Sequence, residues 1–314
     1  MFVDRSTSGI LQLYTRPPWG SVGDLLMATP AIDVFKKRFP NSKVIVDAES
    51  WQSRALYKNP LIDELHNLCF KVPAKIREQD QGWDTRQHPV RQIMQKAGLV
   101  IDTDTDLQIK IFSDDKDAQV VLDWMYEQKL EEKRFAIFAV HNSWLIRSEI
   151  VRAIILQLLK RDLTPVMIGQ AAEAYIKMNS DCSMILADDQ RIGWRVTHLK
   201  ELIRRASLFI SMDAGSAQIA AATDADMIVI YSTNAPETRC PLRKNGFFIP
   251  VQAHNCPCQD HPCHRAPTDM VPNCQNTSNP LACIQSIEPR HIDEAFDQLY
   301  ALRGAAGCPS STKS

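Results

Sequence analysis

Residues 14–48 read YTRPPWGSVGDLLMATPAIDVFKKRFPNSKVIVDA, a glycine-bearing loop and an amphipathic segment between two short apolar runs. The apolar runs, Ile10–Tyr14 and Lys43–Asp47, have the length and composition of strands. Between them, Thr29 is placed to cap a helix, and Pro30 suits the first position of that helix. A helix between two such strands forms a β-α-β unit, so this stretch predicts a parallel sheet in an α/β fold.

The composition is that of a soluble globular protein. The chain has 314 residues, 45% hydrophobic and 23% charged, which is enough for two domains of about 150 residues each. A net charge of -1 predicts no attraction to nucleic acid and at most peripheral contact with a membrane. No apolar run approaches the roughly 20 residues that span a bilayer, and the N-terminus lacks a signal-peptide pattern. We therefore expect the protein in the cytoplasm.

Strands and helices alternate along the chain in two blocks. In the first block we predict a strand at 107–111 and helices at 51–58, 89–97 and 114–130. The charged run at 131–134 is interpreted as a hinge to the second block. There we predict strands at 135–140, 165–168, 184–186, 208–211 and 227–231, and helices at 148–160, 173–178, 198–206, 216–222 and 289–303.

These blocks predict two α/β domains. The first covers residues 1–132. The second covers residues 133–304 and includes a cysteine-rich loop at 254–285. Residues 305–314 are rich in glycine and serine and are expected to form a disordered tail.

Ligands of open parallel sheets bind at the carboxyl ends of the strands, so the loops there hold the candidates for chemistry. Asp24 follows Gly20 and Gly23 after the first predicted strand, and its carboxylate suits a general base facing a cleft between the domains. The residue on its own favours a plain structural role for Asp24, because an aspartate near a helix N-terminus complements the helix dipole. The residues alone leave both interpretations open.

Two further strand ends hold candidate ligand-binding residues. Asp213 and Gly215 form a turn before an alanine-rich helix, where free N–H groups suit a phosphate. The alternative is a tight connection that needs glycine for its geometry alone. Glu173 follows Gly169 at another strand end, where a carboxylate suits a ribose diol or simply complements the first turn of a helix.

Together these segments resemble one family. Residues 20–65 resemble the N-terminal signature of the family 9 glycosyltransferases, the ADP-heptose:lipopolysaccharide heptosyltransferase group. The shared features are Gly23-Asp24, Leu25-Leu26, Thr29-Pro30, a basic helix end at 36–38, and the run NPLIDE at 59–64. Residues 209–237, FISMDAGSAQIAAATDADMIVIYSTNAPE, resemble the second signature. The resemblance covers most of residues 10–300.

This resemblance implies two Rossmann-like domains in the GT-B arrangement, with the donor in the C-terminal domain. It implies an inverting transfer of a heptose-like sugar from a nucleotide-sugar donor such as ADP-heptose to a hydroxyl group of lipopolysaccharide, another glycan, a lipid-linked acceptor or a protein. Asp24 matches the family's general base, Arg147 lies near the phosphate-binding lysine, and Glu173 matches the ribose-binding acid. The resemblance implies donor binding by Gly23, Ser143, Arg147, Glu173, Asp213, Ala214, Gly215 and Gln218.

The chain also departs from the family pattern. Gln218 stands where the family usually has histidine, and a glutamine amide cannot hold a positive charge near a departing diphosphate. Ala214 replaces a serine or threonine, and Ser232 replaces a glycine. The segment from about 66 to 88 is shorter than usual. A catalytically degenerate member that binds a nucleotide or sugar, or acts as a scaffold, is therefore the alternative function.

Five cysteines cluster between residues 254 and 285. Thiols in the cytoplasm rarely form disulfides, so such a cluster indicates a metal site rather than disulfide bonds. Four of the cysteines, Cys258, Cys263, Cys274 and Cys283, are predicted to bind a structural zinc or iron ion tetrahedrally, with Cys256 as a substitute for Cys258. The alternative is a long surface loop of reduced cysteines without a metal. A metal-bound loop with a role in assembly is a third function hypothesis.

Overall fold

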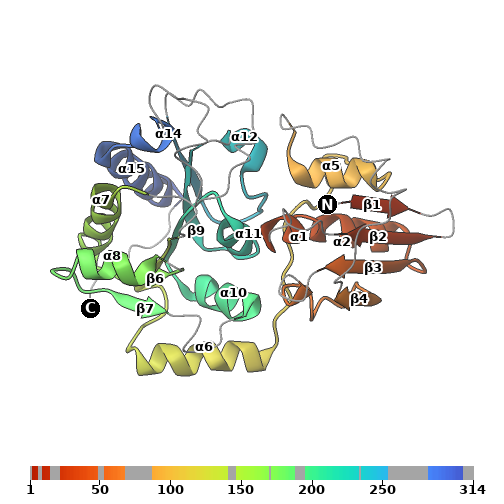
Figure 1. Cartoon of the computed structure of the whole chain (residues 1–314), viewed down its shortest axis with the longest axis horizontal. Helices are drawn as coiled ribbons and strands as arrows, with labels where there is room; N and C mark the ends of the chain where they lie inside the picture. Colours follow the sequence, from red (N-terminus) through yellow and green to blue (C-terminus); the bar gives the residue numbers. More distant parts are fainter. Residues whose placement is uncertain are drawn as a thin grey trace.

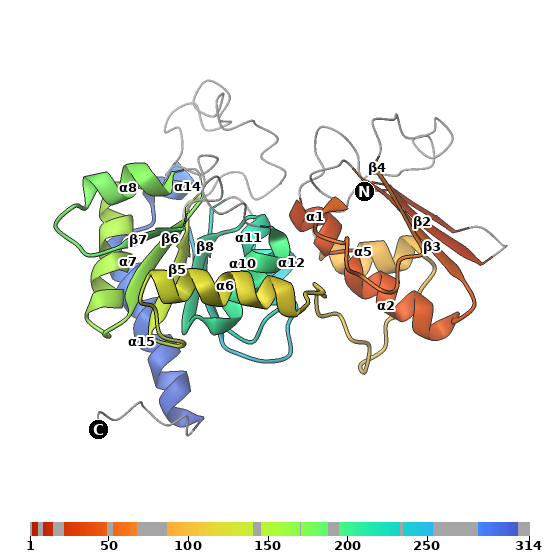
Figure 2. The ribbon, with the colours of Figure 1, turned by 90° about the horizontal axis from the view of Figure 1, so that it is seen from below.

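The computed structural model describes residues 2–5, 9–14, 22–48, 53–67, 87–140, 146–169, 171–187, 195–232, 235–253 and 282–306. These residues form two α/β units, each built around its own sheet (Figure 1). The two units are joined by a linker that leads into a long helix beside the second unit (Figure 2). Within the described residues, no helix combines the length and the hydrophobicity needed to cross a membrane.

The N-terminal sheet has four strands in the order β1 (Phe2–Arg5), β2 (Ile10–Tyr14), β3 (Lys43–Ala48) and β4 (Glu64–Asn67). β1 pairs antiparallel with β2, whereas β2, β3 and β4 run parallel. The helices α1 (Val22–Leu26) and α2 (Thr29–Arg38) connect β2 to β3, and this confirms the predicted β-α-β unit. The edge strand β1 was not predicted from the sequence.

The predicted capping role of Thr29 is wrong. The residue before the helix is Ala28, whose backbone is already helical (φ -84°, ψ -17°) because α1 runs almost directly into α2. Thr29 is the first residue of α2, and its hydroxyl donates to the Leu26 carbonyl at 2.8 Å. The same hydroxyl accepts a hydrogen bond from the backbone N–H of Lys110 at 2.9 Å, and so ties the linker to the N-terminal unit.

The predicted strand at 107–111 is also wrong. Residues 107–114 form no ladder with either sheet, although Ile109 and Ile111 are buried as the alternation indicated. The alternating apolar residues belong to a linker between the two units. Polar groups of this linker form hydrogen bonds with both units. Gln108 Nε2 donates to the carbonyl of Ala221 in the C-terminal unit at 3.4 Å, while Lys110 bonds to the N-terminal unit.

The linker ends in α6 (Asp115–Glu127), which begins with a capping box formed by Asp114 and Asp117. Val121, Trp124 and Met125 are buried as predicted, whereas Val120 is exposed. α6 packs against α10 (Val196–Arg205) of the C-terminal unit (Figures 1 and 2). We therefore propose that the boundary between the domains lies along 107–114 rather than at the charged run 131–134.

The C-terminal sheet has six parallel strands in the order β10-β9-β8-β5-β6-β7. They are β5 (Phe135–Ala139), β6 (Thr164–Ile168), β7 (Ile185–Ala187), β8 (Leu208–Met212), β9 (Asp226–Tyr231) and β10 (Phe248–Gln252). The chain runs outward from β5 to β7, returns to β8 on the other side of β5, and continues outward to β10. This is the doubly wound order of a Rossmann fold, with its switch point between β5 and β8.

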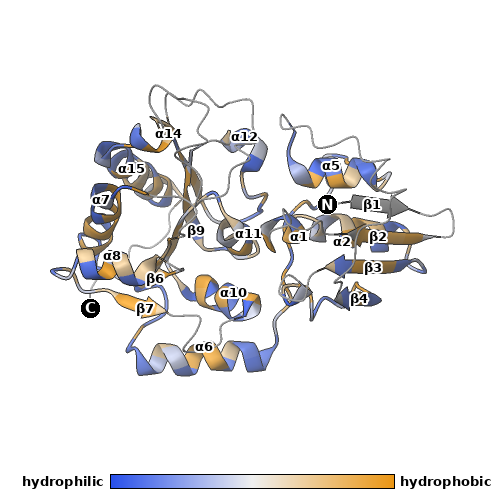
Figure 3. Ribbon diagram, viewed as in Figure 1, coloured by the Kyte–Doolittle hydropathy of each residue, from blue (hydrophilic) through white to orange (hydrophobic). Residues whose placement is uncertain are grey.

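Helices cover both faces of this sheet. One hydrophobic cluster includes Phe209, Val229 and Tyr231 of the sheet together with Ala217 of α11 (Gly215–Ala221) and buried residues of α6 and α10. The opposite cluster joins the sheet to α7 (Ser148–Leu159) and α15 (Pro289–Ala305). Figure 3 shows that α6 and α10 carry hydrophobic and hydrophilic residues on different faces. Two Rossmann-like units of this kind confirm the predicted fold class.

Strand β10 was missed because Pro250 interrupts its sequence. Proline cannot donate to a sheet ladder, so it is tolerated mainly at an edge. β10 is the edge strand of this sheet and has β9 as its neighbour on one side. The missing N–H of Pro250 therefore costs no hydrogen bond to a strand on the other side.

Candidate active site

The carboxyl ends of β5, β6, β8 and β9 lie at the same edge of the C-terminal sheet, because the strands are parallel. Gly169 closes the β6 end tightly against β5. Its φ is +99°, and a Cβ atom there would lie 2.1 Å from the carbonyl oxygen of Val140, so only glycine fits. This close approach shapes the edge beside the switch point, where ligands of doubly wound folds bind.

The turn after β8 lies against the N-terminal unit. A Cβ atom on Gly215 would be 3.3 Å from the backbone nitrogen of Gly23 and 3.7 Å from its Cα. α1 and α11 are accordingly side by side in both views (Figures 1 and 2). The predicted donor turn at Asp213–Gly215 and the predicted base-bearing helix α1 are thus brought together across the domain junction.

Asp24 lies in the first turn of α1, next to Gly23, and is half-buried. Its position in a first turn agrees with the structural interpretation of this residue. Its position beside the Gly23–Gly215 contact agrees with the catalytic interpretation. The two interpretations are compatible, because a group that complements the dipole of α1 also lies at the junction with the predicted donor turn.

Three buried polar atoms near this turn have no hydrogen-bond partner in the described part of the structure. They are Ser211 Oγ at the end of β8, the Tyr231 hydroxyl at the end of β9, and Gln218 Oε1 on α11. Burial, together with the negative charge of Asp213, raises the pKa of Tyr231 above its usual value. Buried polar groups are rarely left unpaired in proteins, so this edge has hydrogen-bonding capacity available for a ligand or for water.

Gln218 does not interact with Arg147, which the resemblance also assigned to the donor. Its Nε2 donates to the carbonyl of Arg239 at 3.5 Å, at the end of α12 (Pro236–Arg239). α12 follows β9 and therefore lies at the same carboxyl edge. Arg239 itself is half-buried, and its guanidinium makes no ion pair or hydrogen bond with the residues that the structure describes.

The chain is similar to known proteins in part of its sequence and in its fold. Residues 194–268, which include β8, α11, β9, α12 and β10, match the model of glycosyltransferase family 9 (heptosyltransferase). The matched residues cover part of the C-terminal unit. The predicted resemblance and the predicted enzyme class, a glycosyltransferase, are thereby confirmed. No curated protein matches the chain by sequence.

Solved structures show the same fold over almost the whole chain. A family 9 glycosyl transferase from Veillonella parvula has a TM-score of 0.65 at 12% identity and covers 93% of this chain and 97% of its own. The ADP-heptose lps heptosyltransferase II of E. coli has a TM-score of 0.59 at 13% identity, with coverages of 93% and 99%. TibC of enterotoxigenic E. coli, described as a dodecameric iron-containing heptosyltransferase in complex with ADP-D-beta-D-heptose, has a TM-score of 0.63 at 14% identity, with coverages of 94% and 78%.

Arg147, which the resemblance places near a phosphate, binds other parts of the chain in this structure. Its guanidinium donates to the carbonyl of Ile287 at 2.6 Å and pairs with Glu149 at 3.0 Å, while its buried Nε has no partner among the described residues. Arg147 therefore links the start of α7 to the segment before α15. Ser143, predicted in the same loop, lies outside the described residues.

Glu173 lies on α8 (Ala172–Met178), at the carboxyl end of β6 where a ribose-binding acid is expected. Its side chain is 65% exposed and pairs with Lys177 at 2.9 Å on the next turn. The carboxylate is exposed, and its ion pair with Lys177 is a surface pair of the kind that contributes little to stability.

The cysteine prediction falls mostly outside the described residues. Cys258, Cys263 and Cys274 belong to the segment 254–281, which the structure does not describe. Cys283 is buried on α14 (Ala282–Gln285), in the cluster that also packs α15. Within the described residues no group of three metal-binding side chains occurs, so the metal stays a prediction.

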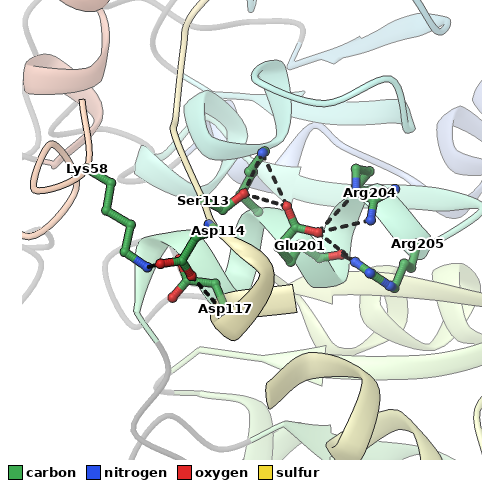
Figure 4. A network of polar contacts seen from close by, with 8 residues as sticks. Lys58, Ser113, Asp114, Asp117, Glu201, Arg204 and Arg205 are labelled. Atoms are coloured by element: carbon green, nitrogen blue, oxygen red, sulfur yellow. Dashed lines mark hydrogen bonds and ion pairs between the residues drawn. The ribbon is translucent and has the colours of Figure 1, made fainter. Parts of the chain in front are cut away.

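A dense polar network fixes the linker to the C-terminal unit (Figure 4). Glu201 of α10 is buried and accepts hydrogen bonds from Ser113 Oγ at 2.6 Å and from Arg205 at 2.7 Å. Lys200 and Arg204 also bind this carboxylate. Although burial opposes ionisation, these donors hold the pKa of Glu201 at about 2. Glu201 is therefore charged at neutral pH and anchors the linker on α10.

A second polar bridge reaches across the domain junction. Lys58 of the N-terminal unit binds the buried Asp117 at 2.6 Å and Asp114 at 2.8 Å, both at the start of α6. Asp117 also contacts Nε2 of His198 on α10 at 3.2 Å. These contacts hold α6, α10 and the N-terminal unit together at one end of the linker.

Sequence reasoning missed two residues near the junction, His88 and Arg239. His88 directly precedes the predicted helix at 89–97, and Arg239 lies just after the end of the second signature at residue 237. Their common neighbour is Cys240, whose carbonyl bonds to His88 across 152 positions of sequence. Arg239 could have been proposed from the sequence, because a cation directly after a strand-end loop is placed to stabilise negative charge on a ligand.

Proposed function

We propose that this chain is an inverting glycosyltransferase that moves a heptose-like sugar from a nucleoside-diphosphate donor such as ADP-heptose to an acceptor hydroxyl. The observation that carries the proposal is the contact between Gly23 and Gly215. It joins the helix that bears Asp24 to the turn that the resemblance assigns to the donor. E. coli heptosyltransferase II is named for ADP-heptose, and TibC is described in complex with ADP-D-beta-D-heptose, which supports the choice of donor.

Asp24 is the proposed general base. Its carboxylate takes the proton of the acceptor hydroxyl as that oxygen forms a bond to the anomeric carbon, and the nucleoside diphosphate leaves with the bonding electrons. The attack comes from the face opposite the leaving group, so the configuration of the anomeric carbon is inverted. The acceptor is therefore proposed to lie on the side of the N-terminal unit, whose helix α1 supplies the base.

The departing diphosphate needs positive charge. Gln218 is neutral, and the guanidinium of Arg147 already binds Ile287 and Glu149. We propose that Arg239 supplies it, since its guanidinium has no partner among the described residues. Arginine binds phosphate oxygens through two parallel hydrogen bonds, which suits a diphosphate.

The rest of the donor is assigned by position along the same edge. Glu173 is proposed to bind the ribose diol, and the turn at Asp213–Gly215 is proposed to contact the sugar and phosphate. Ser211 Oγ and the Tyr231 hydroxyl provide additional buried hydrogen-bonding capacity beside that turn. A glycan is the proposed acceptor, either free or attached to a lipid or a protein, and the cytoplasm is the proposed compartment.

The four cysteines Cys258, Cys263, Cys274 and Cys283 are proposed to hold a structural metal ion. The buried position of Cys283 supports an anchor at one end of the segment, and TibC is described as iron-containing. Elemental analysis of the purified protein, with and without Cys274→Ser, tests this assignment. Equal metal content in both proteins contradicts it.

Calorimetric titration with ADP, UDP and GDP tests the donor assignment, followed by measurement of ADP release from ADP-heptose in the presence of bacterial glycan acceptors. The proposal expects binding of ADP in preference to the other two and acceptor-dependent release of ADP. Binding without release would support the degenerate, non-catalytic alternative. No binding of any nucleoside diphosphate contradicts both.

A further inference from the structure

His88 is a buried residue of the N-terminal unit that contacts the C-terminal unit directly. It is the N-cap of α5 (Pro89–Lys96) and is only 6% exposed. Its Nε2 donates to the carbonyl oxygen of Cys240, which follows α12, at 2.8 Å. This hydrogen bond joins two segments that are 152 positions apart in the sequence.

Both nitrogens of the imidazole are used. Nδ1 accepts the backbone N–H of Val90 at 3.3 Å and so caps α5. A ring that accepts at Nδ1 and donates at Nε2 is neutral. The pKa of His88 falls to about 4, mainly because the ring is buried. The positive charges of Arg239 and Arg91 lower it further. His88 therefore keeps both hydrogen bonds across the physiological pH range.

The segment that receives this hydrogen bond is held from two sides. His88 binds the carbonyl of Cys240 from the N-terminal unit, while Gln218 of α11 binds the carbonyl of Arg239 from the C-terminal unit. Within the segment, Thr238 N–H donates to Ala235 and Cys240 N–H donates to Pro236, at 3.0 Å and 2.6 Å. The backbone on either side of the Arg239 side chain is thus fixed by residues of both units.

We propose that His88 is a positioning residue whose Nε2–H holds the segment 236–240, and with it Arg239, at the donor edge of the C-terminal sheet. The N-terminal unit then sets the place of the group that binds the diphosphate, in addition to supplying the base. This inference rests on the proposed function, because it takes the carboxyl edge beside β9 as the donor site. The cap of α5 is a second and separable role of the same ring.

Two substitutions separate these roles. In His88→Asn, the short side chain keeps an oxygen at the capping position but does not reach the carbonyl of Cys240. In His88→Gln, the longer amide places a nitrogen donor near the position of Nε2, while glutamine is a poor N-cap. If His88 only capped α5, Asn would be the tolerated replacement. If it positions the donor segment, Gln is the better replacement.

The experiment measures backbone hydrogen exchange of residues 236–242 and of α5, and the affinity for ADP by calorimetry, in the wild-type protein and both variants. For His88→Asn we expect faster exchange at Thr238 and Cys240, unchanged exchange in α5, and an ADP affinity about fivefold lower, the usual effect of one neutral hydrogen bond. For His88→Gln we expect exchange at 236–242 and ADP affinity near those of the wild type, with faster exchange at the start of α5. The inference is overturned if His88→Asn matches the wild type in both the hydrogen exchange of residues 236–242 and the affinity for ADP. It is also overturned if His88→Gln, rather than His88→Asn, shows faster exchange at 236–242 and weaker ADP binding.

The two proposals fail in different ways. A wild-type protein that does not bind ADP removes the proposed function. Exchange at 236–242 still decides the role of His88 in that case: faster exchange in His88→Asn retains His88 as the residue that holds this segment, and unchanged exchange removes it.

Discussion

Asp24 and Arg239 face opposite demands of the proposed reaction, since one must accept a proton and the other must stabilise negative charge. Asp24 could be proposed from the sequence, because the Gly-Asp pair and the helix that follows it are contiguous. Arg239 and His88 were missed, because the roles proposed for them depend on contacts with Gln218 and Cys240 that only the folded chain brings about. Local patterns predict which residues end a strand or begin a helix, and they say little about which distant segments meet.

Arg239→Ala is expected to lower the affinity for ADP by about 10-fold to 100-fold, the range for a hydrogen bond to a charged group. Arg239→Lys keeps the charge without the paired geometry and is expected to fall between alanine and the wild type. Calorimetry with ADP measures the effect. The control is Arg290→Ala, an exposed arginine of α15 that pairs with Glu288. Equal ADP affinity in Arg239→Ala and in this control would assign the diphosphate to other residues.

At the scale of elements, α10 and the linker form the structural link between the two units. The sequence predicted α10 and the sheet strands beside it well, because buried apolar residues recur there with clear periodicity. It predicted a strand for the linker, because alternation of Leu107, Ile109 and Ile111 reflects burial alone and not hydrogen bonding to a neighbouring strand. It also predicted a hinge at 131–134. Lys133 of that run binds carbonyls at the end of α10, which is one reason to propose the boundary at 107–114.

Glu201→Ala is expected to destabilise the protein by about 3–5 kcal/mol, because it leaves buried Arg205 without its closest carboxylate. Chemical denaturation monitored by circular dichroism measures the change. The matched control is Arg204→Ala, which removes a half-exposed partner of the same carboxylate and is expected to cost no more than about 1 kcal/mol. Similar losses in the two variants would show that Glu201 is not the anchor of this network.

At the scale of the whole molecule, the two units behave as one packed body. A single hydrophobic cluster extends from β2 and β3 through α1 and α2 to α11 and one face of the C-terminal sheet. The sequence predicted two domains and a shared edge for their ligands. It did not predict that the junction would be a close backbone contact at Gly23 and Gly215, because the spacing of two glycines 192 positions apart has no local signature.

The stability of the folded protein is expected to fall as the pH falls from 6.5 to 4. The pKa of His88 is about 4 in the folded protein and near 6.5 when unfolded, so the unfolded chain binds the extra proton over this range. The expected contribution is of order 3 kcal/mol. Burial lowers the pKa of His198 as well, which acts in the same direction. A further loss is expected from pH 4.5 to 2 as Glu201 is protonated.

Melting temperatures measured from pH 8 to pH 3 test this dependence. His88→Gln should be less stable than the wild type at pH 7 and should lose less stability between pH 6.5 and 4, because glutamine has no proton to bind. A variant whose pH profile runs parallel to that of the wild type would contradict a neutral, buried His88.

The most direct test of the account is acceptor-dependent turnover of ADP-heptose by Asp24→Asn, with ADP affinity measured on the same preparation. The control is Asp115→Asn, an exposed aspartate in the first turn of α6. General bases contribute about 100-fold or more to rate, so turnover by Asp24→Asn should fall by at least that factor while ADP binding stays within about twofold of the wild type. Turnover equal to that of the control would contradict a base supplied by α1 at the domain junction.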